Sequence, residues 1–308
     1  MMTMDQPGTT TPPLPPPIQQ RTPRDVSTSV RWSLRLGSAL GLVGWGMFGF
    51  GMIFFWLFAM NADVASLWQF DGETEQAPGQ VTRSEKTKFT IGGNRKRGRP
   101  GKPVYANAYV FAAPDGTEHR GVSYATDASL IAGQAVEVEY PKGEPHVSRI
   151  VGMRRAPFDA WSALTALVPV VGLGLIVAGV RRGGRHADLL ENGRLAWGKM
   201  VSKEATQARV NRKTVYRMTF EFTADNRRTY QVETRTHATE ELEDEEHEVI
   251  LYQPGNPDVA VVADGLPAGV RIDEKGQVHQ KRPLLVSLLL PTAALVGHAT
   301  YLCTTYLQ

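Results

Sequence analysis

The sequence predicts a membrane protein that combines three membrane-spanning α-helices with all-β parts, in the form of two small antiparallel, five-stranded, barrel- or sandwich-like modules. Three observations lead to this prediction. The apolar residues are concentrated in three uncharged segments, the stretches between these segments alternate polar and apolar residues, and the two stretches resemble each other. The 308 residues are enough for two or three small domains.

The three apolar segments cover residues 36–60, 161–180 and 284–303, and none of them contains a charged residue. A helix needs about 20 predominantly apolar residues to cross a bilayer, and each segment reaches that length. The alternative, a buried helix of a soluble core, would usually show a polar stripe, and none is visible. We therefore predict transmembrane helices at 36–60, 158–181 and 283–304.

Basic residues near the ends of these segments predict the orientation, because Lys and Arg are retained on the cytoplasmic side. Twelve of them favour one topology: Arg21, Arg24, Arg31, Arg35, Arg181, Arg182, Arg185, Arg194, Arg271, Lys275, Lys281 and Arg282. Three of them, Arg149, Arg154 and Arg155, oppose it. We expect a multi-pass protein of the cell membrane with a cytoplasmic N-terminus, an extracytoplasmic module at 61–157 and a cytoplasmic module at 182–280.

Residues 1–35 are rich in Pro and Thr and offer few side chains to bury. This composition predicts a disordered cytoplasmic tail with polyproline II character, and the prolines at 12–17 leave an SH3-like recognition motif open. The apolar segment that follows is longer than the roughly 7–15 apolar residues of a cleaved signal peptide. We interpret it as a signal anchor.

The stretches between the spans predict two β modules, at residues 61–157 and 182–280. Every second residue from Tyr216 to Phe222 is apolar, which is the pattern of a half-buried strand. Turn sequences separate such runs, as at Asp115-Gly116. We expect strands near residues 79–86, 104–112, 117–124, 134–140 and 146–151, and near residues 196–204, 214–223, 228–236, 247–252 and 258–263.

The two modules also align with each other. Val104-Tyr105 matches Val215-Tyr216, and Tyr109 and Phe111 match Phe220 and Phe222, all at an offset of 111 residues. The turn Asp115-Gly116 then matches Asp225-Asn226 at an offset of 110. Finally, YPKGEP at 140–145 matches YQPGNP at 252–257 at an offset of about 112. Landmarks in the same order at a nearly constant offset favour a duplicated module. The turn match implies a deletion of one residue in the second module.

The composition and the known motifs limit the function classes. A net charge of +3 is too small to indicate nucleic-acid binding, and the single cysteine, Cys303, cannot form an intramolecular disulfide. No phosphate loop, dinucleotide fingerprint, Gly-x-Ser-x-Gly elbow or His-Glu-x-x-His motif occurs. His298 lies five residues before Cys303, on a different helix face, which disfavours a Cys/His nucleophile pair. We predict no catalytic residues and no cofactor.

The densest set of potential metal ligands is the acidic run TEELEDEEHE at 239–248, which His237 precedes. His237, Glu245 and His247 could together hold a divalent cation. The run aligns, however, with residues 127–134 of the first module, a loop that lacks such ligands. A solvated acidic loop is therefore the preferred interpretation, and a short helix or a contact for the basic tail stays open.

A basic insert separates the first two strands of the first module. Its charged residues are Arg95, Lys96, Arg97, Arg99 and Lys102. They could contact anionic lipid head groups or another polyanion, whereas the alternative is a flexible, solvated loop rich in glycine. Nucleic acid is not an expected partner, because the predicted topology places this module outside the cytoplasm.

Glycines recur along the first apolar segment. Gly37, Gly41 and Gly44 permit a close backbone approach. They are consistent with a homo-oligomer and equally with packing against the other spans of the same chain.

The second module resembles the bacterial membrane proteins grouped as domain of unknown function 3592. The resemblance rests on GRLAWG at 193–198, on the aromatic strand at 216–222, on VILYQPGNP at 249–257 and on the adjacent apolar segments. It covers residues 191–263 best and 79–151 less well, since the first module has its proline directly after Tyr140 and carries the basic insert. The resemblance implies a β module tied to membrane helices, and it brings no activity.

These features favour a non-enzymatic membrane protein that interacts or senses through its two β modules. A membrane-bound enzyme, such as a hydrolase with its site in a module cleft or between the spans, is the alternative. An enzyme should have a pocket where two or three polar groups converge. An accessory subunit that packs on a transporter is the third interpretation.

Overall fold

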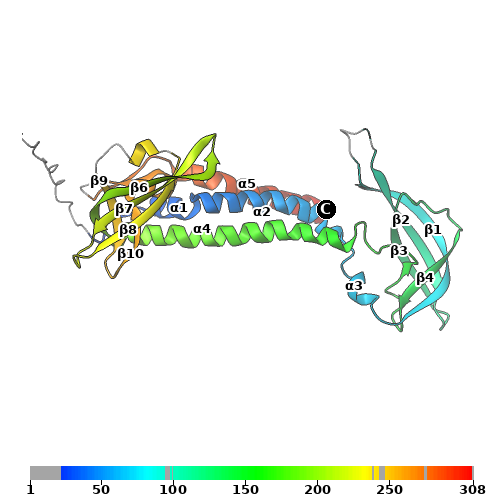
Figure 1. The fold of residues 1–308 in the computed structure, drawn as a ribbon. Coiled ribbons are helices and arrows are strands. Elements are labelled where there is room, and N and C mark those ends of the chain that lie inside the picture. Colours follow the sequence, from blue (N-terminus) through cyan, green and yellow to red (C-terminus); the bar gives the residue numbers. More distant parts are fainter. Residues whose placement is uncertain are drawn as a thin grey trace, which may run out of the picture. The chain divides into compact units, whose positions relative to one another are not determined.

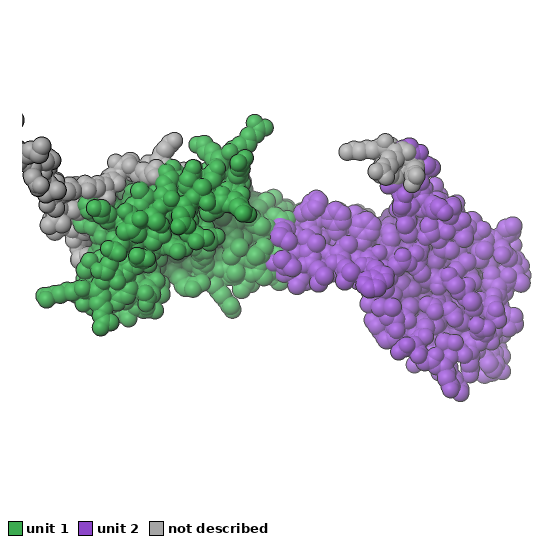
Figure 2. All heavy atoms as spheres, in the orientation of Figure 1, with its two compact units in different colours: residues 1–46, 172–308 green, residues 47–171 purple. Residues whose placement is uncertain are grey.

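A computed structural model describes residues 22–93, 98, 100–237, 239–242, 247–273 and 276–306. The chain forms two compact units, which Figure 2 distinguishes by colour. Unit 1 comprises residues 1–46 and 172–308, and unit 2 comprises residues 47–171. We call the five-stranded sheet of unit 2 the first module, because it comes first in the chain, and the five-stranded sheet of unit 1 the second module.

The α-helices account for the three apolar segments and for two shorter pieces of chain (Figure 1). They are α1 (Thr28–Leu36), α2 (Ala39–Leu57), α3 (Ser66–Gln69), α4 (Leu167–Asn192) and α5 (Leu284–Tyr306), with 3₁₀ turns η1 (Ala59–Asn61), η3 (Ala160–Ala166), η4 (Thr239–Leu242), η5 (Ala263–Gly265) and η6 (Pro267–Gly269).

Three of the described helices are long and apolar enough to cross a membrane, at Ala39–Asn61, Ala160–Asn192 and Leu284–Thr305. Many of their large apolar side chains point away from the protein. Phe50 is 63% exposed and Leu289 is 68% exposed, which soluble core helices would not allow. The prediction of three apolar helices of spanning length is confirmed.

The helix of the second span is longer than the sequence predicted. The expected end was residue 181, and α4 continues to Asn192. Ala187, Leu189 and Leu190 are buried in this extension, where they join an apolar cluster with the second module. The helix therefore changes from a uniformly apolar surface to a one-sided apolar face that packs on the β sheet.

The first module has five antiparallel strands in the order β3-β2-β1-β4-β5. Their bounds are β1 Thr74–Ile91, β2 Lys102–Ala112, β3 Glu118–Thr126, β4 Ala135–Pro141 and β5 Arg149–Ile150. The core of this sheet is formed by Ala77, Tyr109, Phe111, Val138, Tyr140 and Ile150.

The second module has five antiparallel strands in the corresponding order β8-β7-β6-β9-β10. Their bounds are β6 Arg194–Val210, β7 Lys213–Thr223, β8 Thr229–Thr236, β9 His247–Gln253 and β10 Asn256–Val262. All ten predicted strands overlap the observed ones. A hairpin that the sequence did not predict, β11 (Val270–Ile272) with β12 (Val278–Gln280), follows this sheet.

The two sheets also share their register. Gly79 of β1 lies opposite Phe111 of β2, and Gly198 of β6 lies opposite Phe222 of β7. Both strand pairs have irregularities two residues and seven residues further along the first strand. Such irregularities bend a strand locally, so equal positions give the two sheets equal curvature.

The second irregularity is formed by the same contacts in both sheets. Thr87 Oγ1 donates to the carbonyl of Val104 at 2.8 Å, and Thr206 Oγ1 donates to the carbonyl of Val215 at 2.7 Å. In each case the hydroxyl also accepts from the backbone N–H two residues later. This correspondence in strand order, register and side-chain contacts is what the predicted repeat requires.

One detail of the sequence alignment is wrong. The turn Asp115-Gly116 corresponds to Asn226-Arg227, because the Thr117 and Arg228 N–H groups donate to Asp115 Oδ1 and Asn226 Oδ1. Gly116 and Arg227 both have positive φ, at 83° and 58°. The offset therefore stays at 111 and no residue is deleted. In residue type, Asp225-Asn226 is closer to Asp115-Gly116 than Asn226-Arg227 is, so residue types alone favour the wrong register.

Each sheet curls until its edge strands approach each other, which makes it a near-barrel. In the first module the N–H of Ile150 in β5 donates to Ser123 Oγ in β3 at 2.8 Å. The chain after β5 then pairs with β3 through two backbone hydrogen bonds between Tyr124 and Arg154. In the second module β8 and β10 lie next to each other. Closing a sheet removes the unpaired edges that favour aggregation.

Residues 28–35 were expected in the disordered tail, and they form α1 instead. Ser27 caps the helix by accepting a hydrogen bond from the N–H of Val30, and Gly37 ends it. Val30 and Leu34, one helical turn apart, are buried against the second module together with Val26. Figure 1 shows α1 beside the strands of this module. The composition of the first 20 residues concealed this short amphipathic helix, and residues 1–21 lie outside the described part.

Arg24 ties the start of this segment to α4. Its side chain is 5% exposed and donates to the carbonyl oxygens of Leu190 at 3.1 Å and Gly193 at 2.7 Å. Its N–H donates to the carbonyl of Glu191 at 2.8 Å. The free carbonyls at the C-terminus of α4 carry partial negative charge, so a guanidinium is a fitting partner.

Glycines bring α2 close to α4. A Cβ at Gly44 would lie 2.7 Å from the Ile176 nitrogen and 2.8 Å from the Gly172 oxygen, and a Cβ at Gly179 would lie 2.8 Å from the Gly41 Cα. Gly37 faces Ser287 of α5 and Ala268 of η6. Of the two interpretations of these glycines, packing within one chain is the one that the contacts support.

We predict that Gly44→Ala lowers the free energy of unfolding by about 1–3 kcal/mol, because its methyl group would meet the backbone of α4. Gly46→Ala is the matched control, since a Cβ at Gly46 meets nothing within 4 Å. It should stay within about 1 kcal/mol of the wild type. Unfolding of the full chain in mixed detergent micelles measures both, and equal losses in the two variants would contradict the packing described.

Candidate functional site

The predicted metal ligands do not assemble in the described part of the chain. His237 is exposed in the turn after β8, His247 begins β9, and Glu245 lies outside the described residues. Among the described residues, no group of three or more His, Cys, Asp or Glu is placed to hold a metal ion. The acidic run is not a solvated loop throughout: its start forms the 3₁₀ turn η4 (Thr239–Leu242), as the short-helix alternative expected, and its last two residues belong to β9, where Glu248 is buried. Residues 243–246 lie outside the described part.

The basic insert belongs to the first module alone. The equivalent hairpin of the second module is closed by Asn211 and Arg212, both with positive φ, between the paired residues Val210 and Lys213. Lys102 begins β2 and forms an exposed ion pair with Asp127 at 3.5 Å. The other four charges of the insert, Arg95, Lys96, Arg97 and Arg99, lie outside the described residues.

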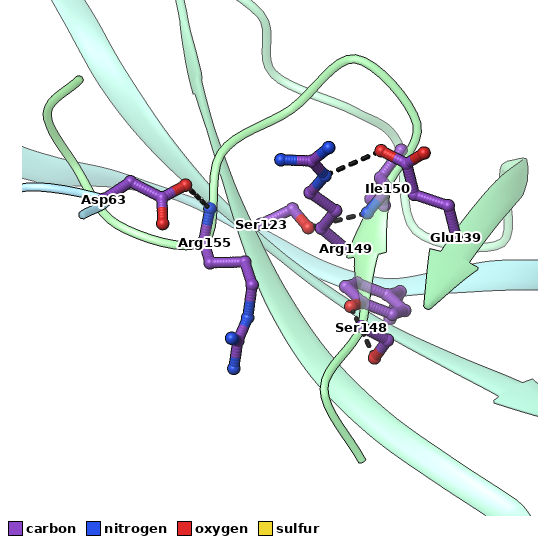
Figure 3. A network of polar contacts seen from close by, with 8 residues as sticks. Asp63, Ser123, Glu139, Ser148, Arg149, Ile150 and Arg155 are labelled. Atoms are coloured by element: carbon purple, nitrogen blue, oxygen red, sulfur yellow. Dashed lines mark hydrogen bonds and ion pairs between the residues drawn. The ribbon is translucent and has the colours of Figure 1, made fainter. Parts of the chain in front are cut away.

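The three arginines that opposed the predicted topology all have partners within unit 2, and Figure 3 shows two of them, Arg149 and Arg155. Arg149 Nε donates to Glu139 Oε1 at 2.6 Å, and its guanidinium lies 4.0 Å from the centre of the Phe70 ring. Both members of the ion pair are largely buried. The ion pair joins β5 to β4, and the contact between Arg149 and Phe70 joins the chain that leaves α3 to the sheet.

Arg154 and Arg155 connect the end of the sheet to the segment before α4. Arg154 donates to Asp159 Oδ1 at 2.8 Å and to Thr126 Oγ1 at 2.9 Å. The N–H of Arg155 donates to the buried carboxylate of Asp63 at 2.8 Å, and its side chain donates to Gln69. These contacts fasten the chain that enters and leaves the first module, so all three arginines have a structural role.

A buried polar pair distinguishes the first module from the second. The Tyr109 hydroxyl, in a residue that is 1% exposed, donates to Ser148 Oγ at 3.0 Å, and Ser148 is 5% exposed. Burial raises the pKa of Tyr109 above its usual value, an effect that outweighs the opposing hydrogen bonds. In the second module Phe220 occupies the place of Tyr109, and Ala260 lies where Ser148 would be.

Asn107 adds to this polar interior. It is fully buried, its Oδ1 accepts from the N–H of Leu130 at 3.3 Å, and its side-chain amide donates to the Ala128 carbonyl at 3.4 Å. Met218 is the equivalent residue of the second module. The first module therefore holds the loop between β3 and β4 with side-chain hydrogen bonds, where the second has an apolar core.

A polar cavity of about 600 Å³ lies in unit 1. It is lined by the junction of α1 and α2 at residues 37–40, by Arg182 and His186 of α4, by residues 233–235 of β8, and by Gly265 and Pro267. Four separate stretches of the chain contribute to it. The sequence contained no signal for this cavity, because its polar residues are adjacent only after α1 and α4 have packed on the second module.

The cavity brings two arginines and an imidazole together. Arg182 and His186 are one helical turn apart on α4, and Arg235 comes from β8. Glu233 is the carboxylate among the lining residues. His186 Nδ1 is buried, and it has no hydrogen-bond partner among the described residues. The lining therefore carries more positive than negative charge.

Comparisons of the chain with models of protein families, with curated proteins and with solved structures give no match. The resemblance to domain of unknown function 3592 stays a prediction.

We predict that Tyr109→Phe and Ser148→Ala each cost about 1–3 kcal/mol of stability, because each leaves a buried hydroxyl without its partner. The double variant should recover part of that loss, since it recreates the Phe and Ala of the second module. Thermal unfolding in detergent of the full-length wild type, the two single variants and the double variant measures the interaction between the two hydroxyls. Strictly additive losses would show that the two hydroxyls do not interact.

Proposed function

We propose that this protein is a non-enzymatic, multi-pass membrane protein that interacts or senses through two β modules on opposite sides of the bilayer. The observation that carries the proposal is the filled interior of both modules. Tyr109 and Tyr140 are 1% exposed in the first module, and Phe220 and Tyr252 are 1% exposed in the second.

The aromatic rings leave little room for a substrate inside either module. Phe111 and Tyr140 have ring centres 5.5 Å apart, and Phe222 and Tyr252 have ring centres 5.4 Å apart. Small barrels that hold ligands keep an open interior, whereas filled barrels act through their outer surfaces and loops. The filled interiors therefore favour binding of partners at the outer surfaces of the modules.

The proposed topology has a cytoplasmic N-terminus, an extracytoplasmic first module and a cytoplasmic second module. The basic residues in the C-terminal part of α4 and those before α5 support it. Three basic residues, Arg149, Arg154 and Arg155, opposed this topology. Their contacts within unit 2 give them a structural role that is independent of orientation in the membrane.

A membrane-bound hydrolase is a second candidate, and one observation favours it. His186 and Glu233, an imidazole and a carboxylate, line the same cavity. An accessory subunit of a transporter is the third candidate, supported by the outward-facing apolar side chains of the helices.

A photo-cross-linking residue at Ile131 tests the interaction proposal. Ile131 is 76% exposed on the first module, so a partner of this surface can contact it. We expect a discrete protein adduct from membranes of living cells, and none from the matched polar position Glu118, which is also exposed. If neither position, nor Val201 on the second module, forms a protein adduct, the interaction proposal fails.

Labelling with a membrane-impermeant maleimide tests the topology. In a Cys303→Ser background, we expect Glu144→Cys in the first module to react in intact cells and Asp258→Cys in the second to react only after lysis. Both positions are exposed in the folded modules. Reaction of both, or of neither, before lysis would place the modules on the same side and exclude the proposed topology.

A further inference from the structure

The polar cavity of unit 1 is at the level where two apolar helices end. Residues 37–40 begin the first apolar segment, and Arg182 is the second residue after the uncharged stretch that ends at Val180. If α2 and α4 cross the bilayer, as the proposed function requires, these positions fall at the head-group layer. The cavity is then open to phospholipid head groups.

The charged groups of the cavity are available to a ligand. Arg182 and Arg235 are exposed, and neither has an ion pair or hydrogen bond with another described residue. The lining contains two arginines from different elements and one carboxylate, Glu233. A planar guanidinium donates two parallel hydrogen bonds to phosphate oxygens, so arginines are the common choice for phosphate recognition.

Further donors are fixed by the fold. Ser38 is 6% exposed, and its Oγ accepts from the N–H of Gly41 at 3.1 Å, which leaves its own hydrogen free to donate. The buried Nδ1 of His186 has no partner among the described residues, and Thr234 supplies a second hydroxyl to the lining. A buried polar atom without a partner is costly, and a bound ligand would satisfy it.

We propose that this cavity binds the phosphate group of an anionic phospholipid. The volume of about 600 Å³ is in the range of small-molecule sites and exceeds what a phosphate alone needs. The position at the end of the apolar helices favours a lipid over a soluble phosphate. The inference rests on the membrane crossing of α2 and α4, and it is independent of which side the second module faces.

The test uses the full chain in nanodiscs of phosphatidylcholine with a minor fraction of phosphatidylglycerol. Native mass spectrometry after release from the nanodisc measures which lipids stay bound. We expect the wild type to retain phosphatidylglycerol over phosphatidylcholine, and the double variant Arg182→Gln/Arg235→Gln to lose that preference about tenfold or more. Both arginines are exposed, so the variant should fold, and thermal unfolding in pure phosphatidylcholine checks this.

The matched control is Arg209→Gln/Arg228→Gln, which removes two exposed arginines of the second module that do not line the cavity. It should keep the wild-type preference. An equal loss in the control, or no preference in the wild type, would overturn the proposal. Displacement of phosphatidylglycerol by millimolar inorganic phosphate would overturn the lipid as the source of the phosphate. The maleimide labelling reads the topology separately, so its failure would not be confused with a failure here.

Discussion

The close approach of α2 and α4 is the contact on which the rest of the structure depends. In a bilayer the hydrophobic effect does not drive helices together, so packing has to come from surfaces that fit closely. Gly44 and Gly179 supply such surfaces, because their missing side chains let backbone meet backbone. In chain order, the first module comes between α2 and α4, and the second module follows directly after α4. Each module is therefore tied to the same helix pair.

The two modules show how one barrel can have two kinds of interior. Strand order, register and curvature agree between them. The first module closes with hydrogen bonds from Ser123, Ser148 and Asn107, whereas the second closes on apolar side chains. The second module also buries the outer face of β9 against α1 and α4, which explains why Ile250, Leu251 and Tyr252 are all buried in succession. A strand covered on both sides loses the alternation that a half-buried strand keeps.

Arginine serves different purposes in the two units. In unit 2, three arginines form contacts that connect the sheet to the neighbouring chain: Arg149, Arg154 and Arg155. In unit 1, Arg24 closes the end of α4, while Arg182 and Arg235 line a cavity without a partner among the described residues. A count of basic residues treats these alike, although a paired guanidinium and a free one differ in what they can bind.

The elements with local signals could be predicted from the sequence. Uncharged stretches of spanning length predicted the three helices, and the period of two from Tyr216 to Phe222 predicted a strand that is present as β7. Repeated landmarks predicted a duplicated module, and the two sheets share strand order, although the alignment was one residue out at Asn226. These signals depend on a residue and its neighbours in the chain, so no tertiary structure is needed to read them.

Which residues contact each other depends on the tertiary structure. It placed α1 and the end of α4 on the second module, paired Arg149 with Glu139, and gathered Ser38, Arg182 and Arg235 around one cavity. These residues come from distant stretches and carry no shared pattern. Their contacts arise because burying the apolar faces of α1 and α4 brings the chain segments together, and the polar groups beside those faces are brought together with them.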